Sequence, residues 1–155
     1  MNKTLITYFS CTGNTKNIAI KLKDVLKGDL FEIEPSIFYS SDDLNWKDEK
    51  SRSSVEMKDD SIRPNIKNKI DLTGYDKIYL GYPIWWYKAP RIINTFLESY
   101  DFKNKKVYLF ATSGGSSIDN SYLELTKLYS NINFLKIKVF NPNISIYELE
   151  KELNN

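Results

Sequence analysis

The chain has 155 residues, 41% of them hydrophobic and 14% aromatic, which favours one domain, residues 1–155, around a single core. Its 22 basic and 20 acidic side chains leave a formal charge of +2, and so weak a field predicts neither a nucleic-acid partner nor a membrane partner. One cysteine and no histidine exclude internal disulfides, zinc–histidine sites and histidine-dependent triads. We therefore expect a cytoplasmic protein that relies on a cofactor for any chemistry near neutral pH.

Five short segments have the composition of β-strands. The first four are apolar or aromatic-rich, as expected of strands covered on both faces of a parallel sheet. The fifth alternates lysine with aliphatic residues, which is typical of an edge strand. In chain order the segments are Lys3–Phe9, Leu30–Glu34, Lys77–Tyr82, Lys106–Thr112 and Phe134–Phe140. The first strand begins at once, without a preceding apolar segment, so we expect no signal peptide.

Helical patterns separate these strands. An apolar stripe runs from Ile18 to Leu26, and we expect Gly28 to close that helix. A second stripe follows Pro90, a residue tolerated in the first turn of a helix. Two more follow Ser121 and Ser145, each with a glutamate three residues later, which is the spacing of a capping box. Strands alternating with helices predict an α/β protein with a parallel sheet between two helical layers.

The stretch from residue 35 to 75 interrupts this alternation. It is polar, and its only helical hint lies around Trp46–Met57. A connection of this length is usually functional or partly disordered. We interpret it as a solvated surface loop between the second and third strands, from which Tyr39, Trp46 and Arg63-Pro64 could pack back on the body.

The loop after the first strand, Ser10–Thr15, predicts a phosphate site. It leads into a helix, whose free N–H groups and dipole favour an anion, and its three hydroxyls and one amide add neutral donors. Gly13 allows a ligand to approach the backbone closely. The Walker and dinucleotide glycine motifs are both absent, so the loop suits a mononucleotide phosphate.

Two further loops would meet this one if the strands are neighbours, because ligands of parallel sheets bind beyond the carboxyl ends of the strands. After the third strand, Trp85, Trp86 and Tyr87 stand between Pro83 and Pro90. Three adjacent aromatics are poor turn chemistry, and they favour stacking on a flat aromatic ligand. After the fourth strand, a small and flexible Ser/Gly loop could follow the edge of such a ring.

These loops resemble those of the flavodoxins. Tyr8–Thr15 is similar to the flavodoxin phosphate loop, Ser/Thr-x-Thr-Gly-x-Thr, and Gly81–Trp86 and Thr112–Ser116 are similar to the two flavin-ring loops of a flavodoxin-like subfamily. The resemblance spans essentially the whole chain. It implies a flavodoxin-like three-layer sandwich, a five-stranded parallel sheet in the order 2-1-3-4-5, and FMN as cofactor. It places around FMN the residues Ser10, Cys11, Thr12, Gly13, Asn14, Thr15, Pro83, Ile84, Trp85, Trp86, Tyr87, Thr112, Ser113, Gly114, Gly115 and Ser116.

The function implied is electron transfer by an FMN-binding carrier that meets a redox partner protein, as a monomer or weak homodimer. The alternative is an NAD(P)H-dependent FMN or quinone reductase, in which residues 35–75 build a second pocket and Arg63 or Lys88 meets a cofactor phosphate. Two departures from the family stand out. Flavodoxins carry a glycine beside the flavin in the first ring loop, and the segment Pro83–Ala89 has none, which argues against strong stabilisation of a half-reduced flavin. Flavodoxins are also acidic, whereas this chain is nearly neutral, so the identity of the partner does not carry over.

Cys11 raises a remote alternative. A cysteine in an anion-binding loop at a helix N-terminus is the arrangement of small tyrosine phosphatases. Their loop has an arginine six positions after the cysteine, where this chain has Asn17, and the Asp-Pro pair of their general acid is also missing. We therefore interpret Cys11 as a small loop residue. A domain that keeps the fold without a ligand is the remaining alternative.

Overall fold

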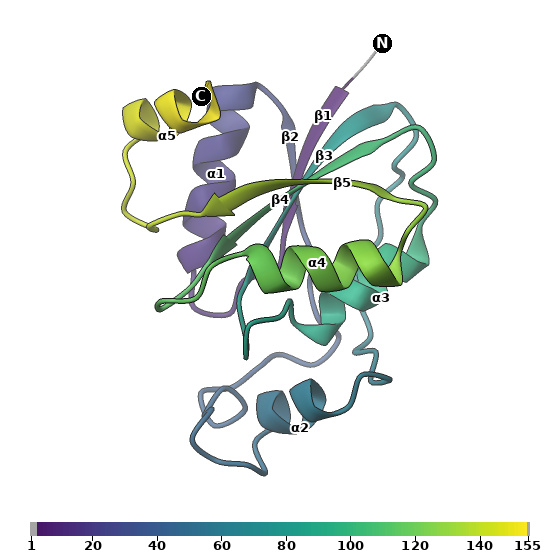
Figure 1. Cartoon of the computed structure of the whole chain (residues 1–155), viewed down its shortest axis with the longest axis vertical. Helices are drawn as coiled ribbons and strands as arrows, with labels where there is room; N and C mark the ends of the chain where they lie inside the picture. The colour runs from purple at the N-terminus through teal and green to yellow at the C-terminus, as the bar shows by residue number, and fades with distance from the viewer. Residues whose placement is uncertain (1–2, 155) are drawn as a thin grey trace.

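A computed structural model of the chain describes residues 3–154. Five parallel strands form one sheet in the order β2-β1-β3-β4-β5, and helices join successive strands, which confirms the predicted architecture (Figure 1). The strands are β1 (Lys3–Tyr8), β2 (Asp29–Glu32), β3 (Tyr75–Pro83), β4 (Lys106–Thr112) and β5 (Asn133–Val139). The helices are α1 (Asn14–Leu26), α2 (Arg52–Lys58), α3 (Arg91–Ser99), α4 (Asp119–Leu128) and α5 (Ile146–Leu153).

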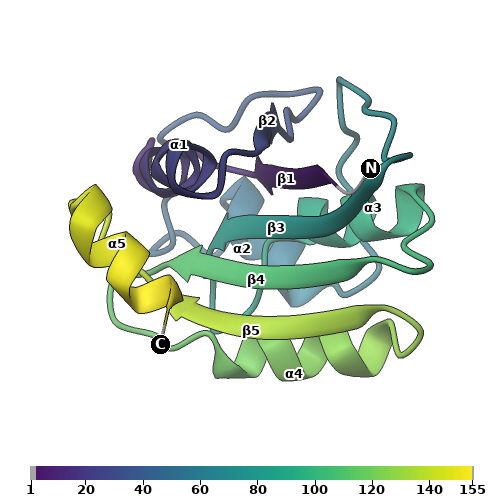
Figure 2. The same ribbon diagram turned by 90° about the horizontal axis from the view of Figure 1, so that it is seen from above.

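The sheet separates two apolar layers. Alternate residues of a strand point to opposite faces, so in β3 Ile78 and Leu80 join the core under α3 and α4, whereas Tyr79 joins the core under α1 and α5. Figure 2 shows the sheet seen from above, with α1 and α5 together at one end of the view and α4 along β5. None of the helices within residues 3–154 is long and apolar enough to cross a bilayer.

The two outer strands are less covered than the inner ones. β5 pairs only with β4, as the alternation of its sequence predicts. β2 pairs only with β1, and Leu30 is 36% exposed, so the expectation that this strand is covered on both faces is wrong. The four residues of β2 are too few for their sequence pattern to show that this strand lies at an edge of the sheet.

Gly28 closes helix α1, as the sequence predicts, because its N–H donates a hydrogen bond to the Lys23 carbonyl oxygen at 3.2 Å. The left-handed residue at the helix end is Lys27 (φ 56°). Gly28 is also required for close packing, because a Cβ there would lie 2.7 Å from Ile6 Cδ1 and 2.8 Å from the Thr4 carbonyl oxygen. The absence of a side chain at Gly28 therefore allows the end of α1 to pack closely against β1.

At one of the two predicted capping boxes the serine caps its helix. Ser145 begins α5 and accepts a hydrogen bond from the Glu148 N–H at 3.1 Å. The box at Ser121 is wrong, because α4 already begins at Asp119 and Ser121 lies inside it, buried, with its hydroxyl against the Tyr82 hydroxyl at 2.8 Å. Packing against β3 decides the role of this serine.

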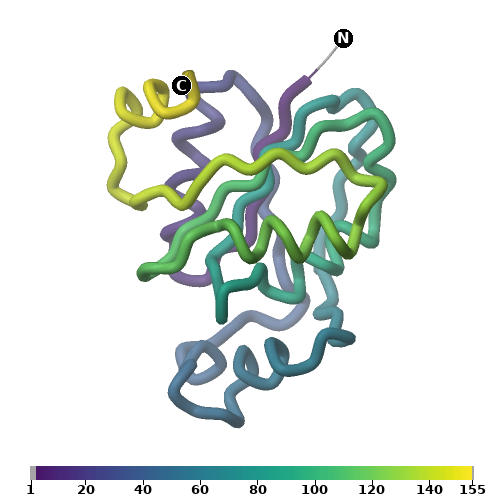
Figure 3. Tube along the Cα trace, in the orientation of Figure 1, coloured from purple at the N-terminus to yellow at the C-terminus, as the bar shows by residue number. Residues whose placement is uncertain are grey.

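The long connection between β2 and β3 contains a helix and several buried residues, although many of its residues are exposed. It extends from the lower end of the sheet and carries α2, as the traces in Figures 1 and 3 show. Arg91, at the start of α3, is 1% exposed and holds this connection against the body of the protein. The guanidinium donates to the carbonyl oxygens of Glu56 (3.2 Å) and Met57 (3.1 Å) and to the Asp60 carboxylate (2.7 Å). One buried arginine thus joins the end of α2 to the body.

Candidate functional site at the carboxyl edge of the sheet

The strand order brings the three predicted loops to one edge of the sheet. Thr112, at the end of β4, contacts both of the other loops. Its hydroxyl lies 2.8 Å from the Thr15 hydroxyl, and its carbonyl oxygen accepts a hydrogen bond from the Ile84 N–H at 2.9 Å. The three loops that were predicted to form one site therefore lie side by side.

The first loop presents an open helix N-terminus. Gly13 precedes α1 in a left-handed conformation (φ 91°), and no side chain caps the helix. Ser10 Oγ accepts a hydrogen bond from the Gly13 N–H at 3.2 Å, which closes the turn. The first N–H groups of a helix have no partner inside it, so those that follow Gly13 can bind an anion. Thr12 and Asn14 are exposed beside them, whereas Thr15 is buried.

The aromatic loop is a strained tight turn. Trp85 and Lys88 exchange two backbone hydrogen bonds, at 2.9 and 3.0 Å. Between them Trp86 (φ 49°) and Tyr87 (φ 68°) both have left-handed backbones. Such a turn normally uses Asn-Gly, and left-handed residues with large side chains are typical of functional sites. Along this turn Trp85 is partly buried, whereas Trp86 and Tyr87 are exposed.

Trp85 is fixed by an aromatic cluster. Its ring packs edge-on against Phe9 (centroids 5.9 Å apart) and Tyr39 (5.6 Å), and these two rings also touch (5.6 Å). Tyr39 donates a hydrogen bond to the buried Glu56 at 2.6 Å, and the Arg52 guanidinium lies 3.6 Å from its ring centroid. Burial, followed by the hydrogen bond to Glu56, raises the Tyr39 pKa. The cluster joins the end of β1, the aromatic turn and the long connection.

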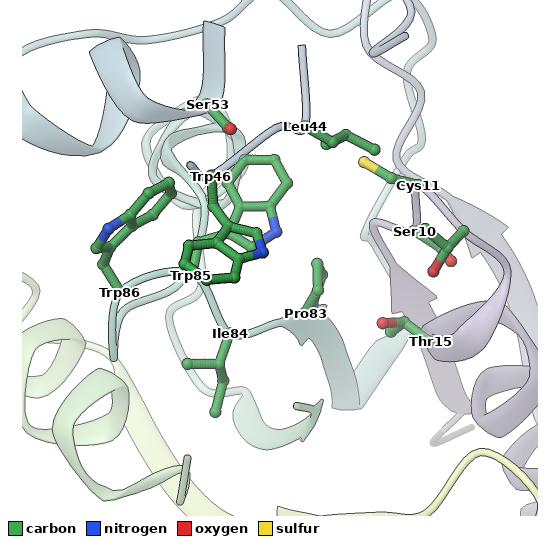
Figure 4. A pocket seen from close by; sticks show the side chains of 11 residues that line it. Ser10, Cys11, Thr15, Leu44, Trp46, Ser53, Pro83, Ile84, Trp85 and Trp86 are labelled. Atoms are coloured by element: carbon green, nitrogen blue, oxygen red, sulfur yellow. The ribbon is translucent and has the colours of Figure 1, made fainter. Parts of the chain in front are cut away.

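A cavity of about 270 Å³ lies between these elements (Figure 4). The sequence-predicted residues that line it are Ser10, Cys11, Thr12, Thr15, Pro83, Ile84, Trp85 and Trp86. Gly13, Asn14 and Tyr87 belong to the same loops but do not line it, and the side chain of Tyr87 is 61% exposed.

The third loop does not line the cavity. Of its predicted residues Thr112, Ser113, Gly114, Gly115 and Ser116, the first is buried between the other loops. The hydroxyl of Ser113 accepts hydrogen bonds from the N–H groups of Gly115 (3.1 Å) and Ser116 (2.8 Å), so the loop folds on itself. It borders the site through Thr112.

Three lining residues come from the long connection: Leu44, Trp46 and Ser53. The sequence offered only two signals for them, Trp46 as a residue that could pack back on the body and the weak helical pattern around it. Nothing in the sequence indicated that Ser53, which is 2% exposed and lies 38 residues after Thr15, lines the same cavity as the phosphate loop. The long connection therefore forms one wall of the site.

The cationic side chains proposed for a nicotinamide phosphate are already paired. Arg63 Nε lies 3.0 Å from Glu98 Oε2, and Lys88 Nζ lies 2.9 Å from Glu124 Oε2. Neither of them lines the cavity.

Cys11 has the wrong electrostatics for a nucleophile. Burial raises the pKa of its thiol to about 12, and the nearby Arg52 opposes this only in part. A cysteine phosphatase needs a stable thiolate at neutral pH. The thiol here stays protonated, which supports its interpretation as a loop residue.

The fold and the site together define a class. A doubly wound sheet has at its switch point an open helix N-terminus and an aromatic-walled cavity, as in proteins that bind a mononucleotide with a flat ring. The chain matches the family model "Flavodoxin" over residues 3–155 and belongs to the flavodoxin family. This confirms the resemblance seen in the sequence.

Solved structures agree with this assignment. Two candidate flavoproteins, from Bacteroides eggerthii and Bacteroides uniformis, are each 46% identical to the chain. The first has a TM-score of 0.93 and is matched over 98% of this chain and 96% of its own; the second has a TM-score of 0.96 and is matched over 99% of each. A flavoprotein from Lactobacillus acidophilus, solved in complex with FMN, is 25% identical (TM-score 0.73, 88% of this chain and 91% of that one). A search of curated proteins gave no match.

Proposed function

We propose that this chain binds FMN in the cavity and serves as an electron carrier between redox partner proteins. FMN is the cofactor of the solved Lactobacillus relative and the one that the sequence resemblance implied. The observation that carries the proposal is that one cavity joins an uncapped helix N-terminus to a wall of aromatic rings. When bound, FMN would supply reversible electron transfer.

The residues present fit this cofactor. The N-terminus of α1, with Ser10 and Thr12, offers N–H and hydroxyl donors to a phosphate. At the other end Trp46, Trp85 and Trp86 offer flat apolar surfaces to a ring. The protein's contribution is to hold the phosphate, orient the ring and keep water from most of it.

Two observations favour a carrier. Trp86, which lines the cavity, is 43% exposed, and the neighbouring Tyr87 is 61% exposed, so aromatic side chains of this loop are available to a partner protein. Arg63 and Lys88, the two side chains suggested for NAD(P)H, are engaged by glutamates.

A reductase is the second candidate, and the wall formed by the long connection supports it. Leu44 and Trp46 extend the cavity beyond the two loops that a carrier needs. Such a wall could hold a second flat molecule against the flavin.

The visible absorption spectrum tests both proposals. The purified protein, loaded with FMN and freed of excess, should show flavin bands with quenched fluorescence. With NADH or NADPH under anaerobic conditions, oxidised bands that persist support a carrier, and prompt bleaching supports a reductase. A protein that takes up no FMN would refute both functions.

A further inference from the structure

The beginning of α2 contains three buried serines with different surroundings. Ser51 caps the helix, accepts a hydrogen bond from the Ser54 N–H (3.3 Å) and donates one to Ser54 Oγ (2.9 Å). Ser53 Oγ has no hydrogen-bond partner among the described residues. Buried hydroxyls are nearly always satisfied, because an unmade hydrogen bond costs free energy. The unpartnered hydroxyl therefore requires an explanation.

The position of Ser53 supplies one. It lines the cavity beside Trp46 and Leu44, on the far side from Thr15 (Figure 4). The only other buried side-chain atom without a partner in residues 3–154, Asn94 Oδ1, belongs to a residue that does not line the cavity. The orphaned hydroxyl thus coincides with the candidate ligand site.

The backbone holds Ser53 firmly in this place. Its N–H donates to the Asp43 carbonyl oxygen at 2.9 Å, which joins α2 to the turn before it. That turn is closed by Ser40 and Asp43, whose side chains each accept the other's backbone N–H at 3.1 and 2.9 Å. Arg91 holds the opposite end of α2. The hydroxyl is therefore presented by a braced helix.

We propose that Ser53 is a binding residue for the flavin ring, and that its hydroxyl hydrogen-bonds to the polar edge of the ring. The inference rests on the proposed FMN site. The phosphate end of the cavity is formed by Ser10, Thr12 and the start of α1, whereas Ser53 lies with the tryptophans. The ring edge carries carbonyl and N–H groups, and a hydroxyl can donate to the first or accept from the second.

Titrations with FMN and with riboflavin, which lacks the phosphate, test this inference. In Ser53→Ala we expect roughly three- to tenfold weaker binding of both flavins, the effect of losing one neutral hydrogen bond. The apoprotein of the same variant should resist urea as well as the wild type or better, because the substitution removes an unsatisfied buried group. A residue with only a structural role would instead lower the stability of the apoprotein.

Two further variants complete the design. Ser61→Ala removes an exposed hydroxyl of the same connection, bonded to Asp59 at 2.6 Å, and should bind both flavins as the wild type does. Ser53→Cys keeps the size of the side chain and replaces the alanine variant if that variant fails to fold. Unchanged affinity in either Ser53 variant, or a loss confined to FMN, would overturn the inference. Wild-type protein that binds neither flavin would refute the proposed function instead.

Discussion

The loop Ser10–Thr15 and the long connection between β2 and β3 line the same cavity but are held in place differently. The loop takes its shape from its own residues, through the positive φ of Gly13 and the hydrogen bond from Gly13 to Ser10. The connection depends on partners elsewhere in the chain, above all Arg91 and the Phe9–Tyr39–Trp85 cluster. One wall of the site is thus locally determined and the other is determined by tertiary contacts, and substitutions can separate the two.

The largest effect on stability is expected at Arg91, which holds the long connection, the wall of the site that depends on tertiary contacts. Arg91→Ala should lower the free energy of unfolding by about 3 kcal/mol, because it leaves two buried carbonyl oxygens and a carboxylate without their donor. Urea unfolding followed by tryptophan fluorescence measures this. Arg63→Ala, which breaks the exposed pair with Glu98, should cost less than ~1 kcal/mol. Equal losses in both variants would contradict the role given to Arg91.

Thr12 tests the local wall. Thr12→Val should weaken FMN binding at least about tenfold, because a hydrogen bond to a charged group contributes about 1.5–3 kcal/mol. Riboflavin affinity and apoprotein stability should not change, since Thr12 is exposed. Fluorescence titration with the two flavins gives both affinities. If FMN bound Thr12→Val as tightly as the wild type, the phosphate would have to lie elsewhere.

The tryptophans of the cavity should separate binding from folding. Trp46 is 67% exposed, so Trp46→Ala should raise the fluorescence of bound flavin and change the stability of the apoprotein by no more than about 0.5 kcal/mol. Trp85→Ala should affect both, with a stability loss of about 1–2 kcal/mol, because Trp85 packs against Phe9 and Tyr39. Steady-state fluorescence and urea unfolding measure the two effects. If neither variant restored fluorescence, the aromatic wall would not contact the ring.

The smallest effect concerns the strained turn. At Tyr87, with φ 68°, glycine should be more stable than alanine by about 1 kcal/mol, because only glycine adopts this conformation without steric cost. Both substitutions remove the same exposed side chain, so the comparison isolates the backbone. Urea unfolding of Tyr87→Gly and Tyr87→Ala measures it. The order reversed, with alanine more stable, would mean that the turn is not strained there.

The fold was predictable to a large extent because short-range patterns specify it. The five strand segments each overlap a strand of the structure, and Ser145 caps α5 as its sequence indicates. The errors are of one kind. Ser121 took its role from a contact with Tyr82 of β3, and Leu30 is exposed because β2 lies at the edge of the sheet; local periodicity contains neither fact.

The sequence by itself determined the strand segments and the chemistry of the three loops, because hydrophobic periodicity and loop composition act over a few residues. Its resemblance to the flavodoxins implied the family and the strand order. Tertiary structure alone decided that the long connection between β2 and β3 is folded, that Arg91 holds it and that Ser53 lines the cavity. The physical reason is the range of the interactions. A buried guanidinium that joins α3 to α2, or a hydroxyl without a partner, depends on distances between residues far apart in the chain.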